Sequence, residues 1–473
     1  MTEIVYAKRI VDFKNIKHPE RIIEKRDLTV GIYEERFAEV SEEGGYIVLD
    51  FGKEMCGGAR ILTGWISNKD KFAEIRIRFG ESLSEVYSEL GEKNSTNDHA
   101  PRDFRYLICG LSDLKIGDTG YRFIRIDFPE GVKIPIKTIA GTNTILKMPV
   151  RYKYNGADKR IKEIFDAAKR TVDLCSGSGW VWDGIKRDRL VWIGDLYPEI
   201  LSLTAMYGRV KAIENSLDFE RRRPRYNGKW SCSIASYSLW WVCCLSEYCY
   251  LTNAYAFTKK QIAYVDEIID IALEHVDEMG EMSYPNYFVD WPTCGTEDDK
   301  VGVRFINILA AKKAKRLYEA FGMDTSKADM LLERLLKGDM TVKRMKQVVG
   351  LKYYALGEIT DEDYALITEG GAKGLSTFMS YFILGAIASR EPDLAVSIMK
   401  DYYGAMLDKG ATTFFEDFDM DWVEGSSRID ELPKEGEKDI HGDFGKHCYV
   451  GFRHSLCHAW SSGVIKFIKE YCS

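Results

Sequence analysis

The sequence predicts an N-terminal antiparallel β-sandwich over residues 1–147, followed by an all-α domain over residues 148–473. Three observations support this division. Apolar and polar residues alternate with the period of a β-strand from about residue 28 to residue 145. Near Met148-Pro149-Val150 the apolar spacing changes to the period of about 3.6 that is typical of helices. The length of 473 residues also exceeds what one ordinary core takes up, so we expect two domains.

The strands of the first domain are predicted from the alternation. In the run 72–79, Ile75, Ile77 and Phe79 share one face and charged residues share the other, as in a half-buried strand. Similar runs occur at residues 46–51, 59–66, 104–109 and 121–128. Turns rich in glycine or polar residues, among them Gly57-Gly58, are expected to separate them and to give antiparallel pairing. The polar segment between Glu81 and Arg102 is predicted to be a loop that could reach the second domain.

The second domain is predicted from stripes of apolar residues at helical spacing. The first stripe consists of Ile161, Ile164, Phe165, Ala168 and Val172. The same spacing recurs at 198–216, 235–252, 258–278, 302–320, 327–349, 373–389, 393–408 and 450–470. No repeat of fixed length is present, so we expect a toroid or bundle of paired helices rather than a solenoid.

The composition limits the classes of function. A net charge of −7 argues against general affinity for nucleic acid or for anionic membranes. The chain has neither a signal-peptide pattern at its start nor a run of membrane-spanning length, so we expect a cytoplasmic location and no membrane partner. The 11 cysteines include no Cys-x-x-Cys pair, which favours reduced thiols over a disulfide framework or a zinc site. We expect no cofactor and no metal, because phosphate-binding and H-E-x-x-H motifs are missing too; homo-oligomer formation is left open.

The stretch from Trp180 to Asp195 is the strongest candidate for a site. It combines three tryptophans with three aspartates and three cations, a mixture that suits the apolar faces and hydroxyl rim of a sugar ring. The alternative is a solvated, salt-bridged loop beside buried tryptophans. Polar and aromatic residues also gather at 222–234, 283–300 and 410–449, which are predicted loops between helices.

Carboxylates occur in two of these loops. One group lies within residues 183–195, and the other comprises Glu416, Asp417, Asp419 and Asp421. Glycoside hydrolysis needs two carboxyl groups, one to protonate the leaving oxygen and one to attack or to activate water. A closed ring of helices could bring the two groups face to face.

The run Asp183-Gly-Ile-Lys-Arg-Asp-Arg-Leu-Val-Trp-Ile-Gly-Asp195 resembles the signature of glycoside hydrolase family 78, the α-L-rhamnosidases of the six-hairpin glycosidase superfamily. Further motifs follow in the order of that family: Asp290-Trp291, Gly410-Ala-Thr-Thr-Phe-Phe-Glu416 and Ser455-Leu-Cys-His458. Weaker similarities to the β-sandwich of the family occur at 49–52, 78–81 and 120–123.

The resemblance implies an (α/α)6 barrel that hydrolyses a terminal α-L-rhamnosyl unit of a small glycoside or oligosaccharide with inversion. It places the general base at Glu416 and the general acid at Asp188. It also implies roles in substrate binding for Asp183, Arg187, Trp192, Asp195, Trp230, Asp290, Trp291 and His458.

Asp188 departs from the family, which commonly has a glutamate as its acid. An aspartate side chain ends about 1 Å short, and such a misplacement can cost on the order of 10²-fold in rate. A pairing of Arg187 or Arg189 with Asp188 would also favour the carboxylate and give a poor proton donor. Asp183 or Asp195 could then be the donor instead.

These departures leave two other functions open. The same barrel could act on another sugar, such as a different 6-deoxyhexose or a uronic acid, or the protein could bind a sugar without turnover. The charged segment 430–443 is longer than we expect for the family. We interpret it as a solvated insertion; the alternative is a cover over the site.

Overall fold

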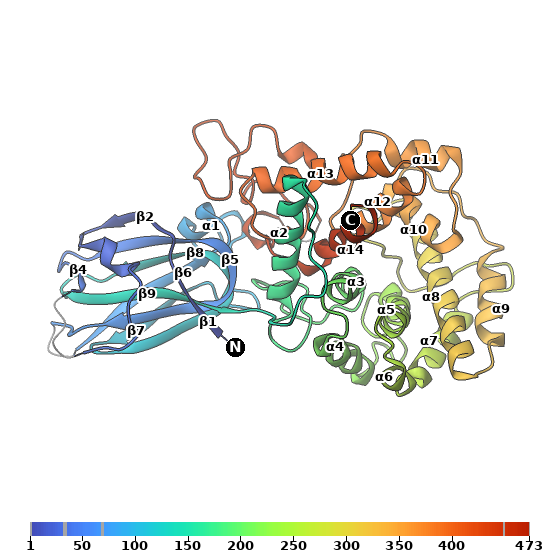
Figure 1. The fold of residues 1–473 in the computed structure, drawn as a ribbon, viewed down its shortest axis with the longest axis horizontal. Coiled ribbons are helices and arrows are strands. Elements are labelled where there is room, and N and C mark those ends of the chain that lie inside the picture. The colour runs from blue at the N-terminus through green and yellow to red at the C-terminus, as the bar shows by residue number, and fades with distance from the viewer. Residues whose placement is uncertain (1, 32–35, 68–70, 448–449, 473) are drawn as a thin grey trace.

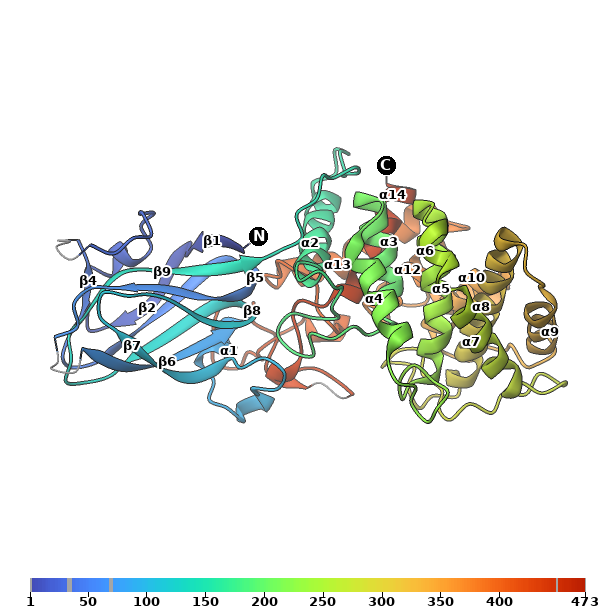
Figure 2. The ribbon, with the colours of Figure 1, turned by 90° about the horizontal axis from the view of Figure 1, so that it is seen from below.

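The computed structural model describes residues 2–31, 36–67, 71–447 and 450–472. An antiparallel β-sheet region (blue to cyan) is followed by a helical region (green to red), and the two lie side by side (Figure 1). In Figure 2 the sheet lies at the left and the helices at the right, with loop-rich segments between them. Within the described residues, no helix is both long enough and apolar enough to span a membrane.

The strands belong to one hydrogen-bonded sheet with the order β3-β4-β9-β5-β8-β6-β7, to which β1 is added on β9 and β2 on β5. All described pairings are antiparallel. The bounds are β1 Thr2–Tyr6, β2 Arg9–Lys14, β3 Ile16–Lys17, β4 Ala38–Val40, β5 Gly45–Thr63, β6 Phe72–Gly80, β7 Asp103–Cys109, β8 Asp113–Phe128 and β9 Ile134–Thr144.

The alternation of apolar and polar residues in the sequence predicted the buried face of β6 correctly. Ile75, Ile77 and Phe79 of β6 are all fully buried in the core of the sheet region. The turn predicted at Gly57-Gly58 is wrong, because both residues lie inside the long strand β5, where its register with β8 shifts. A Cβ atom at Gly58 would lie 2.1 Å from the carbonyl oxygen of Gly117, so the glycine serves close strand approach and not a reversal of the chain.

The helical region has the bounds α2 Lys159–Cys175, α3 Leu196–Tyr207, α4 Lys211–Arg222, α5 Ala235–Thr252, α6 Tyr255–Lys259, α7 Ile262–Glu274, α8 Asp299–Phe321, α9 Ser326–Leu335, α10 Lys346–Leu356, α11 Asp361–Thr368, α12 Ser380–Ala388, α13 Pro392–Asp408 and α14 Val464–Tyr471. Short helix α1 (Leu83–Tyr87) lies in the sheet region. The 3-10 turns are η1 Pro19–Ile22, η2 Glu92–Asn94, η3 Met420–Trp422, η4 Gly451–Arg453 and η5 Ala459–Gly463.

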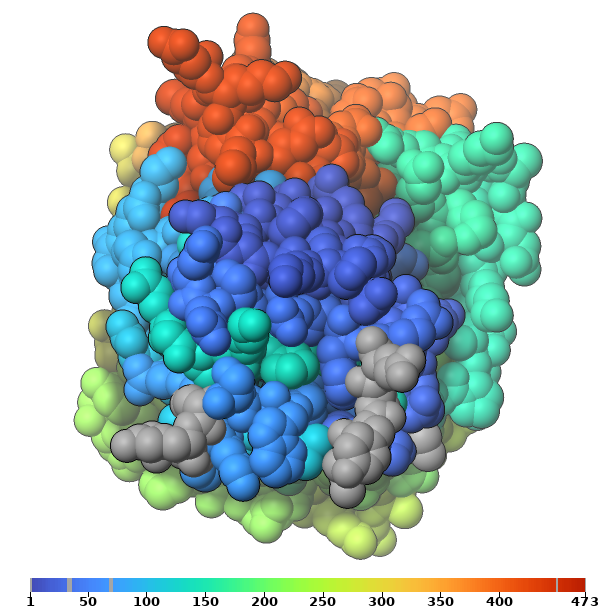
Figure 3. Space-filling view, turned by 90° about the vertical axis from the view of Figure 1, so that its left-hand side faces the viewer, coloured from blue at the N-terminus to red at the C-terminus, as the bar shows by residue number. Residues whose placement is uncertain are grey.

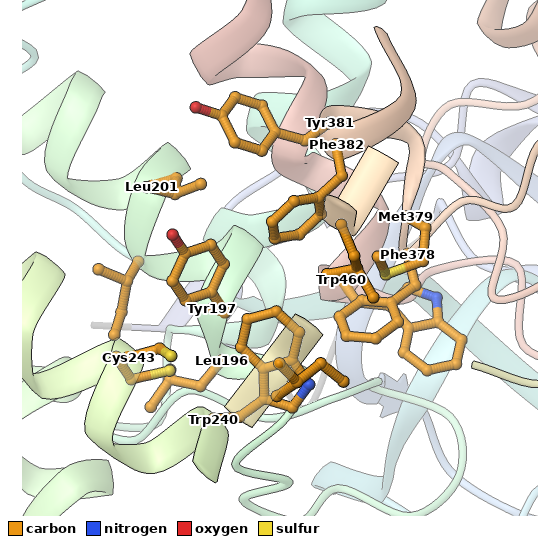
Figure 4. Packing of buried hydrophobic residues seen from close by; sticks show 14 of the residues in the cluster. Leu196, Tyr197, Leu201, Trp240, Cys243, Phe378, Met379, Tyr381, Phe382 and Trp460 are labelled. Carbon is orange, nitrogen blue, oxygen red and sulfur yellow. The ribbon is translucent and has the colours of Figure 1, made fainter. Parts of the chain in front are cut away.

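The helices α3, α5, α8, α10, α12 and α14 contact one another in a closed cycle. Aromatic side chains from α3, α5 and α12 pack together in the core of the helical region (Figure 4). Tyr197 lies 4.9 Å from Trp240 and 5.5 Å from Phe382, measured between ring centroids, and Phe378 stacks on Trp460 at 5.1 Å. Rings packed in this way give a rigid base, which matters because Trp460 also faces the cavity described below.

The sheet contacts the helical region through the loop that carries the 183–195 motif. A Cβ atom at Gly120 of β8 would lie 2.7 Å from the amide nitrogen of Lys186, so the motif loop runs directly against the strand. Figure 3, a view onto the sheet end, shows the orange-red segment after α13 along one edge of the sheet. In that segment Asp430 pairs with Arg122 at 3.2 Å, and His441 is buried.

The segment 430–443 is therefore only partly the solvated insertion that the sequence predicted. Its middle, residues 431–438, is exposed apart from the half-buried Pro433. Its two ends pack against the sheet region because their charged and polar side chains find partners there.

Candidate active site

A cavity of about 200 Å³ brings together residues from all four predicted loops and from two of the predicted helices. Its lining comprises Asp183, Asp188, Trp192, Asp195, Ile234, Tyr237, Trp291, Glu416, His458 and Trp460. The aspartates of the first predicted group thus meet Glu416 of the second, although Arg187 and Glu416 are 229 positions apart. The other members of the second group, Asp417, Asp419 and Asp421, do not line this cavity.

The motif loop between α2 and α3 is held in shape by its own hydrogen bonds. The amide of Leu190 donates to Asp183 Oδ1 at 2.9 Å, and the amide of Asp183 donates to the carbonyl of Leu190 at 3.0 Å. The carbonyl of Asp183 accepts from the amide of Ala459 at 2.7 Å, which ties the loop to the segment that carries His458. At the tip, Asp188 has a φ of 60°, in the left-handed region that non-glycine residues rarely adopt. Such backbone strain is typical of functional sites.

One guanidinium connects the two candidate catalytic carboxylates. Arg187 Nη1 lies 3.0 Å from Asp188 Oδ2, and Arg187 Nη2 donates a short hydrogen bond to Glu416 Oε2. Arg187 Nε donates to the carbonyl of Arg453 at 2.8 Å, and Glu416 Oε2 also accepts from the amide of Ser455 at 3.2 Å. Because Arg187 and Glu416 are buried, this fork fixes the orientation of both carboxylates and offsets their negative charge.

The other two aspartates of the motif are buried in an acidic part of the cavity. Burial raises the pKa of Asp195 to about 8, and Asp195 Oδ1 accepts a hydrogen bond of 2.9 Å from Tyr237. Burial, together with the nearby charges of Asp188 and Asp195, raises the pKa of Asp183 well above its usual range. Below about pH 8 Asp195 is therefore favoured as the neutral acid, which can donate as well as accept a hydrogen bond, and the raised pKa of Asp183 shifts that group in the same direction.

His458 lies among these acids. Its Nε2 is 3.9 Å from a carboxyl oxygen of Asp183 and of Asp195, and 3.8 Å from Glu416 Oε1. Burial lowers the pKa of His458 to about 3, so its imidazole is neutral. A neutral imidazole between three carboxyl groups can exchange hydrogen bonds with a bound hydroxyl group without adding charge.

Three tryptophans supply the apolar walls of the cavity. Trp192 packs edge-on against Tyr237 at 6.0 Å, and Trp291 packs edge-on against Phe288 at 4.9 Å. Trp460 Nε1 donates to the carbonyl of Glu416 at 2.8 Å, so this indole also positions the backbone of the candidate base. Aromatic faces beside fixed acids match the alternation of apolar and polar surface on a sugar ring.

Three predicted binding residues do not line this cavity. Arg187 pairs with two residues that do, Asp188 and Glu416, whereas Trp230 and Asp290 have other partners. Trp230 is buried against His275 and Tyr284, with ring centroids 5.3 Å and 5.2 Å away. Asp290 accepts hydrogen bonds from the amide and the hydroxyl of Thr293, at 3.1 Å and 2.6 Å, and from the hydroxyl of Ser376. The side chains of Trp230 and Asp290 therefore connect neighbouring segments of the helical region. Such local partners are expected, because a buried polar group needs a hydrogen-bond partner.

The structure adds residues to the site that the sequence did not single out. Tyr237 and Ile234 come from the start of α5, and Trp460 follows His458 by two positions. Trp460 belongs to η5, and its position two residues after the predicted His458 was the available signal. His99, from the sheet region, also reaches the site, with Nε2 3.2 Å from Asp188 Oδ1. In the sequence His99 is a single histidine in a polar segment, and no motif there indicated a contact with Asp188.

Among the described residues, Glu81, Glu85 and His441 form a group whose ligand atoms are close enough to hold a metal ion, within 4.8 Å of one another. The ammonium of Lys186 lies among them, 3.0 Å from Glu81 Oε2 and 3.3 Å from Glu85 Oε1. It also donates to the carbonyls of Phe452 and His454, at 2.8 Å and 2.6 Å. Lys186 thus supplies the positive charge at this position and links the sheet to the loop next to Arg187.

Several solved structures share this fold. A rhamnosidase from Klebsiella oxytoca with rhamnose bound aligns with a TM-score of 0.75 at 18% identity, over 100% of this chain and 96% of that chain. The GH78 family rhamnosidase of Bacillus sp. GL1 aligns with a TM-score of 0.71 at 18% identity, over 95% of this chain and 48% of that chain. The α-L-rhamnosidase of Streptomyces avermitilis complexed with L-rhamnose aligns with a TM-score of 0.59 at 14% identity, over 98% and 43%.

The chain has the fold of these rhamnosidase structures. It spans nearly the whole of the Klebsiella protein and about half of the other two. The sequence matches no protein-family model, and no curated protein matches it.

Proposed function

We propose that the protein is an exo-acting, inverting glycoside hydrolase of the family 78 kind, which removes terminal α-L-rhamnosyl units from small glycosides or oligosaccharides. The observation that carries this proposal is the pair of carboxylates, Asp188 and Glu416, held by the two arms of the Arg187 guanidinium at one aromatic-walled cavity. The fold shared with rhamnosidase structures, two of them with rhamnose bound, supports the choice of sugar.

In this proposal Glu416 is the general base and Asp188 the general acid. Glu416 takes a proton from the attacking water, while Asp188 protonates the glycosidic oxygen on the opposite face of the ring. An inverting enzyme must leave room for that water, with its carboxyl groups on the order of 6.5–9.5 Å apart. Asp188 and Glu416 pair with different nitrogens of the Arg187 guanidinium and not with each other. This arrangement suits such a separation.

The other cavity residues receive binding roles. Asp183, Asp195 and His458 exchange hydrogen bonds with ring hydroxyls, while Trp192 and Trp291 cover the apolar face and the methyl group of a 6-deoxy sugar. The volume of about 200 Å³ lies below the roughly 300–1,000 Å³ of pockets for drug-sized ligands. A cavity for one ring favours removal of a terminal unit.

We also propose that the helices form an (α/α)6 barrel over residues 148–473 and that the strands form a β-sandwich over residues 1–147. The closed cycle of helix contacts supports the barrel, and the antiparallel strands support the sandwich. The cytoplasmic location stays a prediction.

The test is a panel of aryl glycosides with the purified protein. We expect release of L-rhamnose from an aryl α-L-rhamnoside, and a fall in kcat on the order of 10²–10⁴-fold in Glu416→Gln, which keeps the side-chain shape but cannot act as a base. Turnover by the variant at the wild-type rate would contradict the role of Glu416. Preference for another 6-deoxyhexoside or a uronide would change the sugar, and rhamnose binding in a calorimeter without turnover of any glycoside would make the protein a binding protein.

A further inference from the structure

The sheet region contributes a side chain to the candidate active site. His99 lies in the loop between α1 and β7, and its Nε2 is 3.2 Å from Asp188 Oδ1. We propose that His99 is a positioning residue for the general acid: it holds the proton that Asp188 delivers to the glycosidic oxygen. This inference rests on the proposed hydrolase function.

The loop that carries His99 is fixed at both sides of the histidine. The side-chain oxygen of Asn97 accepts from the amides of Arg102 and Asp103, at 3.0 Å and 3.1 Å. Asp98 pairs with Arg453 of η4 at 2.9 Å, which attaches the loop to the helical region. His99 itself has a φ of 63°. This left-handed conformation is uncommon for a residue other than glycine, and the surrounding contacts hold it.

A second ion pair, between Lys93 of η2 and Asp443 at 2.6 Å, ties the same loop to the segment after α13. The loop therefore has two attachments to the helical region besides the histidine. The backbone that carries His99 is therefore held near Asp188 by these two ion pairs as well as by the contact between His99 and Asp188.

Asp188 needs a proton for its role, and two side chains contact its carboxyl group. Its Oδ2 lies 3.0 Å from Arg187 Nη1, an ion pair that fixes the orientation of the carboxyl group. Its Oδ1 faces His99. An imidazole can act as a proton shuttle, so a histidine at hydrogen-bond distance from Asp188 can pass a proton to it as Asp188 gives one up.

The charged groups around His99 come from three elements. Asp98 belongs to its own loop, Asp188 with its partner Arg187 belongs to the motif loop, and Arg453 belongs to η4, where it neutralises Asp98. An imidazolium at this position therefore faces Asp188 as its main counter-charge, and the side chain is 36% exposed, so solvent can return its proton.

Over one turnover, each residue regains or releases the protons that it gave or took. The imidazolium of His99 gives its Nε2 proton to Asp188, and Asp188 gives a proton to the glycosidic oxygen as the bond between that oxygen and the anomeric carbon breaks. The electron pair of the bond stays on the leaving oxygen, and the attacking water loses a proton to Glu416. His99 then regains a proton from solvent, and Glu416 releases one to solvent.

The experiment compares His99→Ala with the wild type on two α-L-rhamnosides. A 2,4-dinitrophenyl leaving group is a weak base and departs without a proton, whereas a methyl or sugar leaving group needs one. For His99→Ala we expect kcat on the methyl or sugar rhamnoside to fall about 10²-fold with KM little changed, and kcat on the dinitrophenyl rhamnoside to stay near the wild-type value. Free imidazole should restore part of the lost activity, because the site is open to solvent.

Lys93→Met is the matched control, since it removes one attachment of the same loop without touching Asp188. It should retain the ratio of the two rates found for the wild type, and thermal melting of both variants checks that they are folded. Equal loss on both substrates, or no loss on either, in His99→Ala would overturn the role of His99 while the wild type still demonstrates hydrolysis. If the wild type hydrolyses neither substrate, the proposed function fails and the inference fails with it.

Discussion

Arg187 and Glu416 form a buried ion pair in which the guanidinium donates to the carboxylate that we assign as general base. The other arm of the same guanidinium pairs with Asp188. A planar fork can hold two carboxylates in a fixed mutual orientation, which the single ammonium of a lysine cannot do. The relative placement of the acid and the base therefore depends on one side chain.

Replacement of Arg187 by lysine tests this dependence. The charge is retained but the bridge is lost, and we expect kcat to fall on the order of 10²-fold, the cost of a misplacement of about 1 Å. The control is Arg189→Lys, two positions away in the same motif, whose partner Asp118 is exposed. Steady-state kinetics should show wild-type kcat for the control; a similar loss in both variants would contradict the special role of Arg187.

Trp291 is predicted to bind the sugar through its ring. Trp291→Ala should raise KM about tenfold, which corresponds to roughly 1.4 kcal/mol of lost stacking, with a smaller change in kcat. Trp180→Ala serves as the comparison, because Trp180 is 42% exposed and does not line the cavity. An unchanged KM for Trp291→Ala would exclude stacking at this residue.

The raised pKa of Asp195 makes a prediction about stability and pH. Burial raises this pKa from 3.8 to about 8, so between those values the folded state binds a proton that the unfolded chain releases. The contribution of Asp195 is thus complete at acid pH and is lost as the pH rises to and through about 8. Melting curves should show a smaller fall in Tm between pH 5 and about pH 9 for Asp195→Asn than for the wild type.

The exposed residue Asp118 provides the control for that comparison, since Asp118→Asn makes the same change of charge at a solvated position. Its melting curves should run parallel to those of the wild type. Parallel curves for Asp195→Asn as well would show that Asp195 does not carry the predicted proton.

Lys186→Met should destabilise the fold. The variant leaves the carboxylates of Glu81 and Glu85 buried without the ammonium that lies between them, and breaking such a pair costs about 3–5 kcal/mol. Urea unfolding measures the loss. The exposed pair Lys162–Asp166 gives the comparison, because Lys162→Met should cost about 0.5 kcal/mol or less. Equal losses would mean that the Lys186 cluster contributes no more than a surface pair.

Much of the fold could be predicted from periodicity, because burial on one face leaves a period in the sequence. Ile75, Ile77 and Phe79 show this for β6. The prediction failed where close backbone approach decides the structure, as at Gly57-Gly58, since a glycine in a strand and a glycine in a turn look alike in sequence.

The sequence predicted those residues of the candidate site that lie in recognisable motifs. Asp183, Asp188 and Asp195 do meet Glu416 at one cavity. The sequence left open which arginine pairs with Asp188; the structure assigns Arg187 to it and turns Arg189 toward Asp118. The approach of His99 depends on the packing of the sheet against the helices, and no local pattern encodes such a long-range contact.

The stereochemistry of hydrolysis tests the central claim most directly. Proton NMR of the first turnovers of an aryl α-L-rhamnoside distinguishes the two anomers of the released sugar before they equilibrate. If Glu416 activates a water molecule opposite the leaving group, β-L-rhamnose appears first and the α anomer grows in later. Initial formation of α-L-rhamnose would show retention and would contradict the assignment of Glu416 and Asp188 as an inverting pair.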